Sequence, residues 1–264
     1  MKNKIIKINP AYFLLMLLIP LGVSSAQIGG ISGSKLLVPD AEPVEKGKFE
    51  FEPTLSVFSY SKEFDSLGKQ KSLNGHNSAS SLDFRITLGA MEGLEVGTSF
   101  CTDMQEILLG SKAVLFTGDK TAMALLAGVT LPAGNRSVGD TLNNPPSIYS
   151  FSLGAAASNK ISDKSSLDLF FSYSRYENNP QYSNALNFGA SFGFWSLDNL
   201  QAIVEMDGYS AFSSTLYSSK ISLVPGFTYT FSEKLILVLG DQIDLWGKND
   251  FKGSSIFSSF TMSF

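Results

Sequence analysis

The segment ALNFGASFGFW, residues 185–195, alternates between two kinds of side chain. One parity carries the large apolar residues Leu186, Phe188, Ala190, Phe192 and Phe194. Between them, the other parity carries the small or polar residues Asn187, Gly189, Ser191 and Gly193. A period of two indicates a β-strand. Because a soluble sandwich would carry more charge on its water-facing side, this combination is instead typical of a barrel wall between lipid and a wet interior.

The same unit of about ten alternating residues, followed by a break, recurs along the chain. We expect about twelve strands, over residues 48–60, 81–90, 94–100, 110–117, 121–131, 147–157, 165–173, 185–195, 200–206, 219–231, 235–245 and 254–264. Residues 110–117 and 121–131 are apolar on both parities, so their facing stays open, although the turn at Gly118 pairs them as a hairpin.

The breaks between these strands alternate in length. Short breaks fall at 91–93, 118–120, 160–164, 196–199 and 232–234, and longer polar breaks at 61–77, 132–146, 177–184 and 208–218. Short periplasmic turns and long outer loops, with both chain ends in the periplasm, are the layout of a bacterial barrel. The sequence therefore predicts an all-β, transmembrane, antiparallel up-and-down β-barrel over residues 47–264.

The first 26 residues have the form of a secretory signal peptide. Three lysines precede the apolar run 11–23, and small residues end at Ala26. An uncleaved anchor is disfavoured because the run is short and contains Pro20, and a lipoprotein is disfavoured because Gln27 follows the cut. For residues 27–46 we expect a flexible periplasmic tail by default and a small plug in the lumen as the alternative.

The end of the chain, SSFTMSF, places Phe260, Met262 and Phe264 on one parity. It resembles the closing strand of bacterial outer-membrane barrels, which finishes on a C-terminal phenylalanine that the assembly machinery recognises. The resemblance implies that these three residues form a barrel-assembly signal. It also implies that the partners include outer-membrane lipid and the barrel-assembly machinery, and that the protein reaches the cell outer membrane after Sec-type export.

The opening KLLVPDAEPVEKGKFEFEP, residues 35–53, resembles the start of the mature chain in a family of outer-membrane barrels, the phenol meta-cleavage-pathway type transporters. The resemblance implies passage of small, often hydrophobic or aromatic, molecules through the outer membrane. It assigns no individual binding residue.

Charge and rare residues exclude several classes of function. The chain carries 20 Lys and Arg against 24 Asp and Glu, and losing the three signal-peptide lysines lowers the net charge from −4 to −7. This acidity argues against a nucleic-acid partner. Cys101 is the only cysteine and His76 the only histidine, placed in the polar break 61–77. A barrel hydrolase would need His76 beside a wall serine, which nothing in the sequence indicates. We expect no enzyme activity, no catalytic residue, no metal site and no cofactor.

If the large apolar parity faces lipid, the other parity lines the lumen. The lumen-lining candidates are Glu50, Glu52, Asp83, Arg85, Glu95, Asp168, Glu205, Lys220 and Asp244. Acids outnumber bases among them, which predicts a modest preference for cations. Alternatively, such charges form wall-to-wall salt bridges that close a narrow interior.

Three phenylalanines, Phe58, Phe170 and Phe257, also fall on the lumen parity. They predict an apolar stripe for an aromatic or aliphatic solute, unless strand bulges return them to the lipid face. We expect aromatic residues near the outer strand ends to form an interfacial girdle: Tyr173, Tyr209, Tyr217 and Trp246. The predicted function is an outer-membrane channel for passive uptake or efflux of small molecules. The alternative is a structural or interaction barrel with a closed lumen, acting through its extracellular loops.

Overall fold

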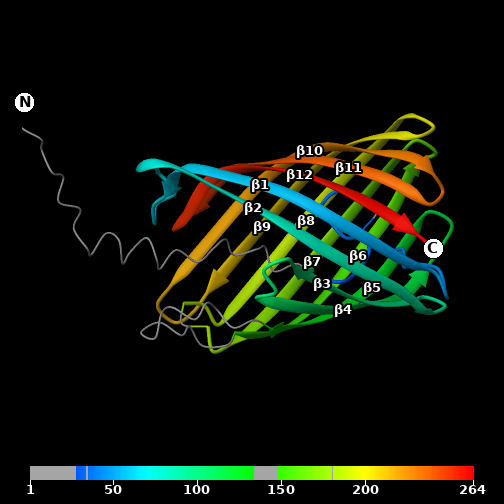
Figure 1. Cartoon of the computed structure of the whole chain (residues 1–264), viewed down its shortest axis with the longest axis horizontal. Helices are drawn as coiled ribbons and strands as arrows, with labels where there is room; N and C mark the ends of the chain where they lie inside the picture. The colour runs from blue at the N-terminus through cyan, green and yellow to red at the C-terminus, as the bar shows by residue number, and fades with distance from the viewer. Residues whose placement is uncertain (1–27, 34, 134–147, 180) are drawn as a thin grey trace, which may run out of the picture.

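A computed structural model of the chain describes residues 28–33, 35–133, 148–179 and 181–264. Twelve antiparallel strands form a closed barrel in these residues, in the order β1-β12-β11-β10-β9-β8-β7-β6-β5-β4-β3-β2 (Figure 1). The strands are β1 (Phe49–Phe64), β2 (Gln70–Met91), β3 (Leu94–Cys101), β4 (Glu106–Thr117), β5 (Thr121–Pro132), β6 (Tyr149–Ser162), β7 (Ser165–Glu177), β8 (Asn184–Leu197), β9 (Leu200–Phe212), β10 (Tyr217–Ser232), β11 (Leu235–Lys248) and β12 (Asp250–Ser263). The predicted fold is confirmed.

The barrel closes between its first and last strands. Their pairing runs from Glu50 opposite Ser263 to Phe64 opposite Asp250. Phe49 and Phe264 exchange two backbone hydrogen bonds, of 3.1 and 2.9 Å. Both ends of the barrel chain therefore lie at the same end of the cylinder as the turns 92–93 and 118–120, which we call the turn end (Figure 1). The opposite end is the loop end.

The described part of the chain contains no helix that is long and apolar enough to cross a membrane. The predicted signal peptide, residues 1–26, lies outside the described residues, as does most of the expected loop 132–146.

The expectation of a long loop over residues 61–77 is wrong. β1 and β2 continue through this region as a hairpin, with Lys62 opposite Ser72 and Phe64 opposite Gln70, and the turn occupies only residues 65–69. On β2 most side chains of this extension are exposed on both faces, so its sequence has no apolar alternation to mark it as strand, whereas Phe64 on β1 is buried against Gly247. His76 lies exposed on β2 in this hairpin extension. The loops within 177–184 and 208–218 are likewise shorter than expected, at residues 178–183 and 213–216.

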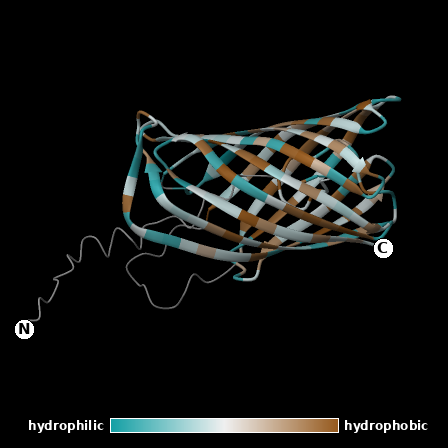
Figure 2. Cartoon of the chain, turned by 90° about the horizontal axis from the view of Figure 1, so that it is seen from above, coloured by the Kyte–Doolittle hydropathy of each residue, from teal (hydrophilic) through white to brown (hydrophobic). Residues whose placement is uncertain are grey.

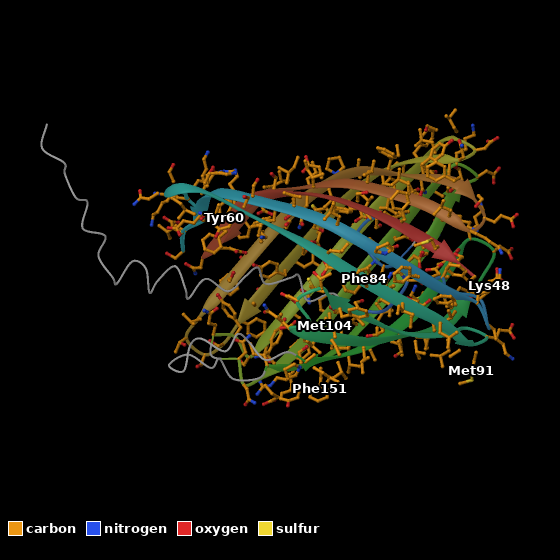
Figure 3. All side chains as sticks on the ribbon, in the orientation of Figure 1. Lys48, Tyr60, Phe84, Met91, Met104 and Phe151 are labelled. Atoms are coloured by element: carbon orange, nitrogen blue, oxygen red, sulfur yellow. The ribbon has the colours of Figure 1, made fainter. Side chains whose placement is uncertain are left out.

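Large apolar side chains cover the outside of the barrel. Leu55, Phe151, Leu153, Phe194 and Ile256 are each about half or more exposed. Figure 2 shows apolar and polar residues alternating along the strands, and Figure 3 shows side chains projecting outward around the wall, with Phe151 among them. This surface meets lipid, as the alternating pattern predicts.

The facing of the fifth strand explains why its sequence is ambiguous. Ala122, Ala124 and Leu126 are buried, whereas Met123 and Leu125 between them are exposed. Both faces are apolar because the outer face meets lipid and the inner one packs against Ile28, Ile31 and other apolar residues inside the barrel.

Residues 28–33 and 35–46, which we call the lumen segment, lie inside the barrel, so the default expectation of a flexible tail does not describe them. The buried residues of this segment include Ile28, Ile31, Val38, Ala41 and Val44. Its hydrogen bonds reach side chains on β2, β3, β4, β6, β7 and β9. Only a chain that crosses the interior contacts strands on so many sides of a cylinder.

Candidate functional site

The turn-end half of the lumen segment is held by one buried ion pair, Glu95 on β3 and Lys112 on β4, which we call the base anchor. Both side chains are fully buried, and their charged atoms are 3.5 Å apart. The Glu95 carboxylate accepts hydrogen bonds from the backbone N–H of Ser32 and of Val44, each at 2.7 Å. One wall carboxylate therefore joins two points of the segment that are twelve residues apart in sequence.

Lys112 completes the base anchor from the neighbouring strand. Its ammonium group donates to the Ser32 carbonyl oxygen at 3.0 Å, to Asp40 Oδ1 at 3.0 Å and to the Glu42 carbonyl oxygen at 2.8 Å. These partners satisfy a charge that has no contact with bulk water, as a buried lysine requires.

The middle of the lumen segment, residues 35–38, is held by two other wall residues, the carboxylates of Glu205 on β9 and Asp168 on β7, which we call the tip anchor. Glu205 accepts hydrogen bonds from three consecutive backbone N–H groups, those of Leu36, Leu37 and Val38, at 3.1, 2.7 and 3.1 Å. Consecutive amides that converge on one anion form a backbone nest. Lys35 forms a buried ion pair with Asp168.

Wall glycines leave room for the lumen segment. A Cβ atom on Gly97 would lie 2.1 Å from the Gly30 carbonyl oxygen, and one on Gly110 would lie 2.0 Å from that of Gly29. Similar overlaps occur between Gly89 and Glu45, Gly128 and Ile28, Gly189 and Val38, and Gly226 and Leu36. Glycine on the inner face therefore permits the close approach of a second backbone.

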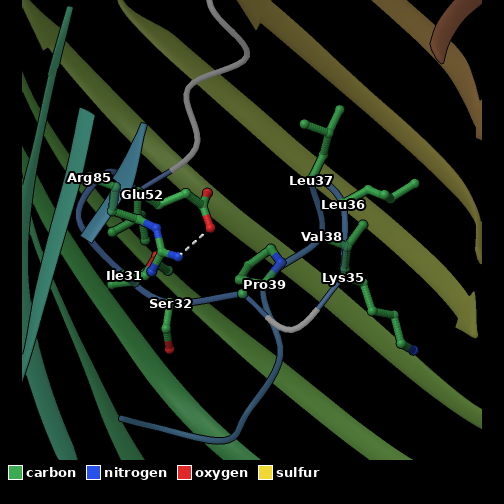
Figure 4. A pocket seen from close by; sticks show the side chains of 11 residues that line it. Ile31, Ser32, Lys35, Leu36, Leu37, Val38, Pro39, Glu52 and Arg85 are labelled. Carbon is green, nitrogen blue, oxygen red and sulfur yellow. Dashed lines mark hydrogen bonds and ion pairs between the residues drawn. The ribbon is translucent and has the colours of Figure 1, made fainter. Parts of the chain in front are cut away.

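A cavity of about 110 Å³ remains between the lumen segment and the wall at β1 and β2. Arg85 and Glu52 line it from the wall, and residues of the segment such as Ile31 and Leu36 line it from the other side (Figure 4). Arg85 is 2.8 Å from Glu52 and 3.4 Å from Glu50, so these three predicted lumen residues form one ion-paired group. Within this group, Arg85 and Glu52 are the predicted lumen residues that line the cavity.

A second charged group lies nearer the loop end. Lys220 is 3.4 Å from Asp244 and 3.8 Å from Asp250, and its ammonium group lies 5.9 Å from the centre of the Phe58 ring. Tyr209 donates a hydrogen bond to Asp250. Tyr209 is therefore inside the barrel, and its expected place in the interfacial girdle is wrong, because it shares the inward parity of Glu205. Asp83, the remaining predicted acid, is half-buried and accepts a 2.8 Å hydrogen bond from Ser81.

The three predicted lumen phenylalanines all lie on the inner side, and two of them pack against the lumen segment. Phe170 is in a buried cluster with Ile28, Ile31 and Val38. Phe257 is in another, against which Leu36 and Leu37 pack. The described strands carry no bulge that would turn these two residues outward. Phe58 is half-buried beside Lys220.

The loop between β7 and β8 covers part of the loop-end mouth. Tyr182 from this loop and Tyr176 pack against a buried cluster of Ala185, Tyr209 and Ala211. Burial raises the pKa of the Tyr182 hydroxyl. This contact brings an aromatic side chain from the rim onto residues of the inner wall.

The predicted assembly-signal residues lie along the outer side of β12. Phe260 and Phe264 are exposed, and Met262 between them is half-buried. The Phe264 ring stacks on Phe49 with their centres 4.9 Å apart, which joins the two ends of the barrel chain.

Sequence reasoning identified the wall carboxylates of the two anchors but did not identify Lys112 or the segment they hold. Two signals point to the segment in retrospect. Its apolar residues Ile28, Ile31, Val38 and Val44 are unusual for a soluble tail. The inner parity of the wall also carries Gly97, Gly110, Gly128 and Gly189. A wall that faces only water does not need glycine at these positions.

Comparison with known proteins places the chain in a family. A family described as "Putative MetA-pathway of phenol degradation" matches residues 13–260. No curated protein matches the sequence. Among solved structures, the COG4313 outer membrane channel from Pseudomonas putida F1 has 13% sequence identity and a TM-score of 0.70, covering 85% of this chain and 98% of that one.

Two other barrels are more distant. The NanC porin has 6% identity and a TM-score of 0.48, covering 79% of this chain and 98% of its own. A loop L8 deletion mutant of OmpT, an outer membrane protein of Vibrio cholerae, has 8% identity and a TM-score of 0.48, covering 82% and 99%. At these scores the two likenesses carry no further argument. The family match over nearly the whole chain, together with the closed twelve-stranded wall, shows that this protein is an outer-membrane β-barrel that belongs to the phenol-degradation MetA-pathway family.

Proposed function

We propose that this protein is an outer-membrane channel through which small molecules cross passively, hydrophobic or aromatic ones among them. One observation carries the proposal: the wall does not fill its own lumen. The inner face is rich in serine, glycine and alanine, and the space that they leave is occupied by residues 28–46. Small barrels can be filled by their own wall side chains, whereas larger ones leave an aqueous channel or hold a plug in the lumen.

The charges inside the barrel support transport through water. Glu52 and Arg85 line the remaining cavity, and Glu50 pairs with Arg85, so acids outnumber bases in this group. Charged rings in a pore select among permeating ions. The family description refers to phenol degradation, and the most similar of the three solved structures above is an outer membrane channel. Both fit a pathway for small aromatic solutes in either direction. The proposal includes no chemical step.

The test compares the full-length protein with a variant that lacks residues 28–44, both refolded and reconstituted. In planar bilayers we expect small, cation-preferring currents from the full-length protein and larger currents from the variant. Liposomes that contain the variant should admit a small aromatic alcohol and a sugar of similar size faster than protein-free liposomes. Absence of current and of solute flux from both proteins would overturn the channel proposal.

The hairpin extension favours a second candidate, an interaction barrel that acts at the cell surface. Most side chains of residues 61–80 are exposed, although β12 still pairs with β1 as far as Phe64. β3 pairs with β2 only as far as Asp83, so among the described residues the edge of β2 beyond it has no strand neighbour on that side. Deleting the part of this hairpin between residues 61 and 77 should leave solute flux intact if the protein is a channel. A partner protein whose binding depends on the hairpin, together with absence of flux, would favour this second role.

The C-terminal residues carry a proposal about assembly. We infer that the barrel-assembly machinery reads Phe260, Met262 and Phe264 before the seam with β1 closes. Phe264→Ala should reduce the fraction of protein that reaches the outer membrane as folded barrel, with little effect on in vitro folding into detergent. An equal loss in both settings would instead show that the stacking on Phe49 stabilises the barrel.

A further inference from the structure

We propose that the lumen segment is a tethered gate whose tip, residues 35–38, leaves the tip anchor to open the channel while the base anchor stays closed. This inference rests on the proposed channel function. It concerns how the pathway opens, and it follows from the different construction of the two anchors.

The base anchor encloses the segment. Glu95 binds both Ser32 and Val44, and Lys112 binds Ser32, Asp40 and Glu42, so the two limbs of the segment are joined to each other as well as to the wall. Opening it requires several buried charge-assisted hydrogen bonds to break at once. Val44 is also close in sequence to residues 47 and 48, through which the segment continues into β1.

The tip anchor holds one short stretch of chain and does not join two limbs. Its contacts are the three backbone bonds to Glu205 and the ion pair between Lys35 and Asp168. The Lys35 ammonium group also donates long hydrogen bonds of 3.5 Å to the carbonyl oxygens of Ser166 and Ser191. All of these groups become hydrated if the tip moves away, so water replaces the lost bonds and no charge is left buried. The apolar cost is confined to the contacts of Leu36, Leu37 and Val38 with the wall.

The cavity gives the direction of movement. It lies beside the tip and is lined by Lys35, Leu36, Leu37, Val38 and Pro39 on the segment, with Glu52 and Arg85 opposite (Figure 4). A tip that leaves β9 has this space beside it, and the room that it vacates along β8 to β10 becomes a route through the lumen.

Two engineered disulfides separate movement of the tip from movement of the whole segment. A Cβ on Gly189 would lie 3.7 Å from the Val38 Cβ, and one on Gly128 would lie 3.5 Å from the Ile28 Cβ, both suitable for a disulfide. The tip lock is Val38→Cys with Gly189→Cys, and the base lock is Ile28→Cys with Gly128→Cys. Both are made with Cys101→Ser, which removes the free thiol, and with Glu205→Gln, which weakens the nest and should raise the open fraction about tenfold.

The measurement is planar-bilayer conductance of each refolded protein before and after reduction with dithiothreitol. We expect oxidation of the tip lock to abolish the current that Glu205→Gln produces, and reduction to restore it. The base lock should conduct equally when oxidised and when reduced. Asp244→Asn serves as the charge control, since Asp244 binds Ser222 and Gly253 of the wall. It should alter ion preference without raising the open fraction.

Equal currents from the oxidised and reduced tip lock, in a protein that conducts, would overturn the gate and leave the channel function standing. Closure by the base lock as well would show that the whole segment must leave the lumen, which also contradicts the proposal. If neither the full-length protein nor the variant without residues 28–44 conducts or admits solute, the channel function itself fails.

Discussion

The base anchor makes a quantitative prediction about Lys112→Met. This substitution keeps the length of the side chain and removes its charge. The ammonium group of Lys112 bonds to Ser32, Asp40 and Glu42, and it is the only cation within 4 Å of Glu95 in the described part of the chain. Without this ammonium group, the buried carboxylates of Glu95 and Asp40 would repel each other with no cation between them. Removing one partner of a buried ion pair costs about 3–5 kcal/mol.

Release of the lumen segment avoids most of this cost, because water then enters and hydrates the carboxylates of Glu95 and Asp40. The loss therefore appears as a shift of the segment from bound to released, and the strands keep their pairing. A cost of about 3 kcal/mol corresponds to a released fraction roughly two orders of magnitude larger.

Thiol labelling measures this released fraction. Val38 is 3% exposed, so Val38→Cys in a Cys101→Ser background presents a thiol that is protected while the segment is bound. We expect Lys112→Met to raise the rate of labelling by a hydrophilic maleimide about a hundredfold. Heat-modified migration in gel electrophoresis should show that the barrel remains folded.

Lys160→Met is the matched control. Lys160 also pairs with the lumen segment, through Glu42 at 3.9 Å, but the two side chains are 69% and 63% exposed. Solvent screens such a pair, so this variant should change the labelling rate by a few-fold at most. Equal labelling rates in the two lysine variants would refute the reasoning that Lys112 holds the segment in place.

Three further predictions concern other parts of the barrel. Gly110→Ala should raise the labelling rate of the Val38→Cys thiol about tenfold. The new Cβ would lie 2.0 Å from the Gly29 carbonyl oxygen and force residues 28–31 away from their hydrogen bonds. Gly33→Ala places its Cβ no closer than 3.9 Å to another atom, so it should change the labelling rate by less than twofold. Neutralising Glu50 and Glu52 together to glutamine should weaken cation preference, and an unchanged reversal potential would place them outside the conduction path. Backbone hydrogen bonds, above all from the Lys69 N–H, lower the pKa of Asp65 below its ordinary 3.8. The contribution of Asp65 to the stability of the turn 65–69 is therefore complete above about pH 4 and is lost as pH falls through the lowered pKa. Amide exchange at Leu67 and Lys69 should accelerate as pH falls through that range, and an Asp65→Asn variant should show no such acceleration.

The sequence predicts the wall well because a lipid-facing strand is strongly constrained. Every second residue must be apolar, so Leu186 to Phe194 and nine similar segments are readable without a structure, whereas residues 110–117 and 121–131 are apolar on both parities. The same reasoning fails over residues 61–77. There most side chains of β2 are exposed on both faces, and the pairing of Lys62 with Ser72 imposes no apolar pattern.

The lumen segment is harder to predict because its partners are distant in sequence. Ser32 meets Glu95 and Val38 meets Glu205, at separations of 63 and 167 residues. No local periodicity encodes such contacts. The sequence shows two sets of residues separately: acids and glycines on the inner parity of the wall, and apolar residues in an expected tail. Each set alone has an ordinary explanation. Only their contact in the folded barrel shows that the wall residues hold the segment.

The same arrangement separates the stability of the wall from the position of the segment. With the tip bound, Glu205 has no exposed surface and depends on the backbone amides of the segment. With the tip released, water hydrates the same carboxylate at little net cost. The pairing of β1 with β12 does not change between these two states, because every backbone bond of the ladder is made within the wall. A protein built this way can move one part of its interior without weakening the barrel, and the balance between the two states is set by how well amides compete with water for a few carboxylates.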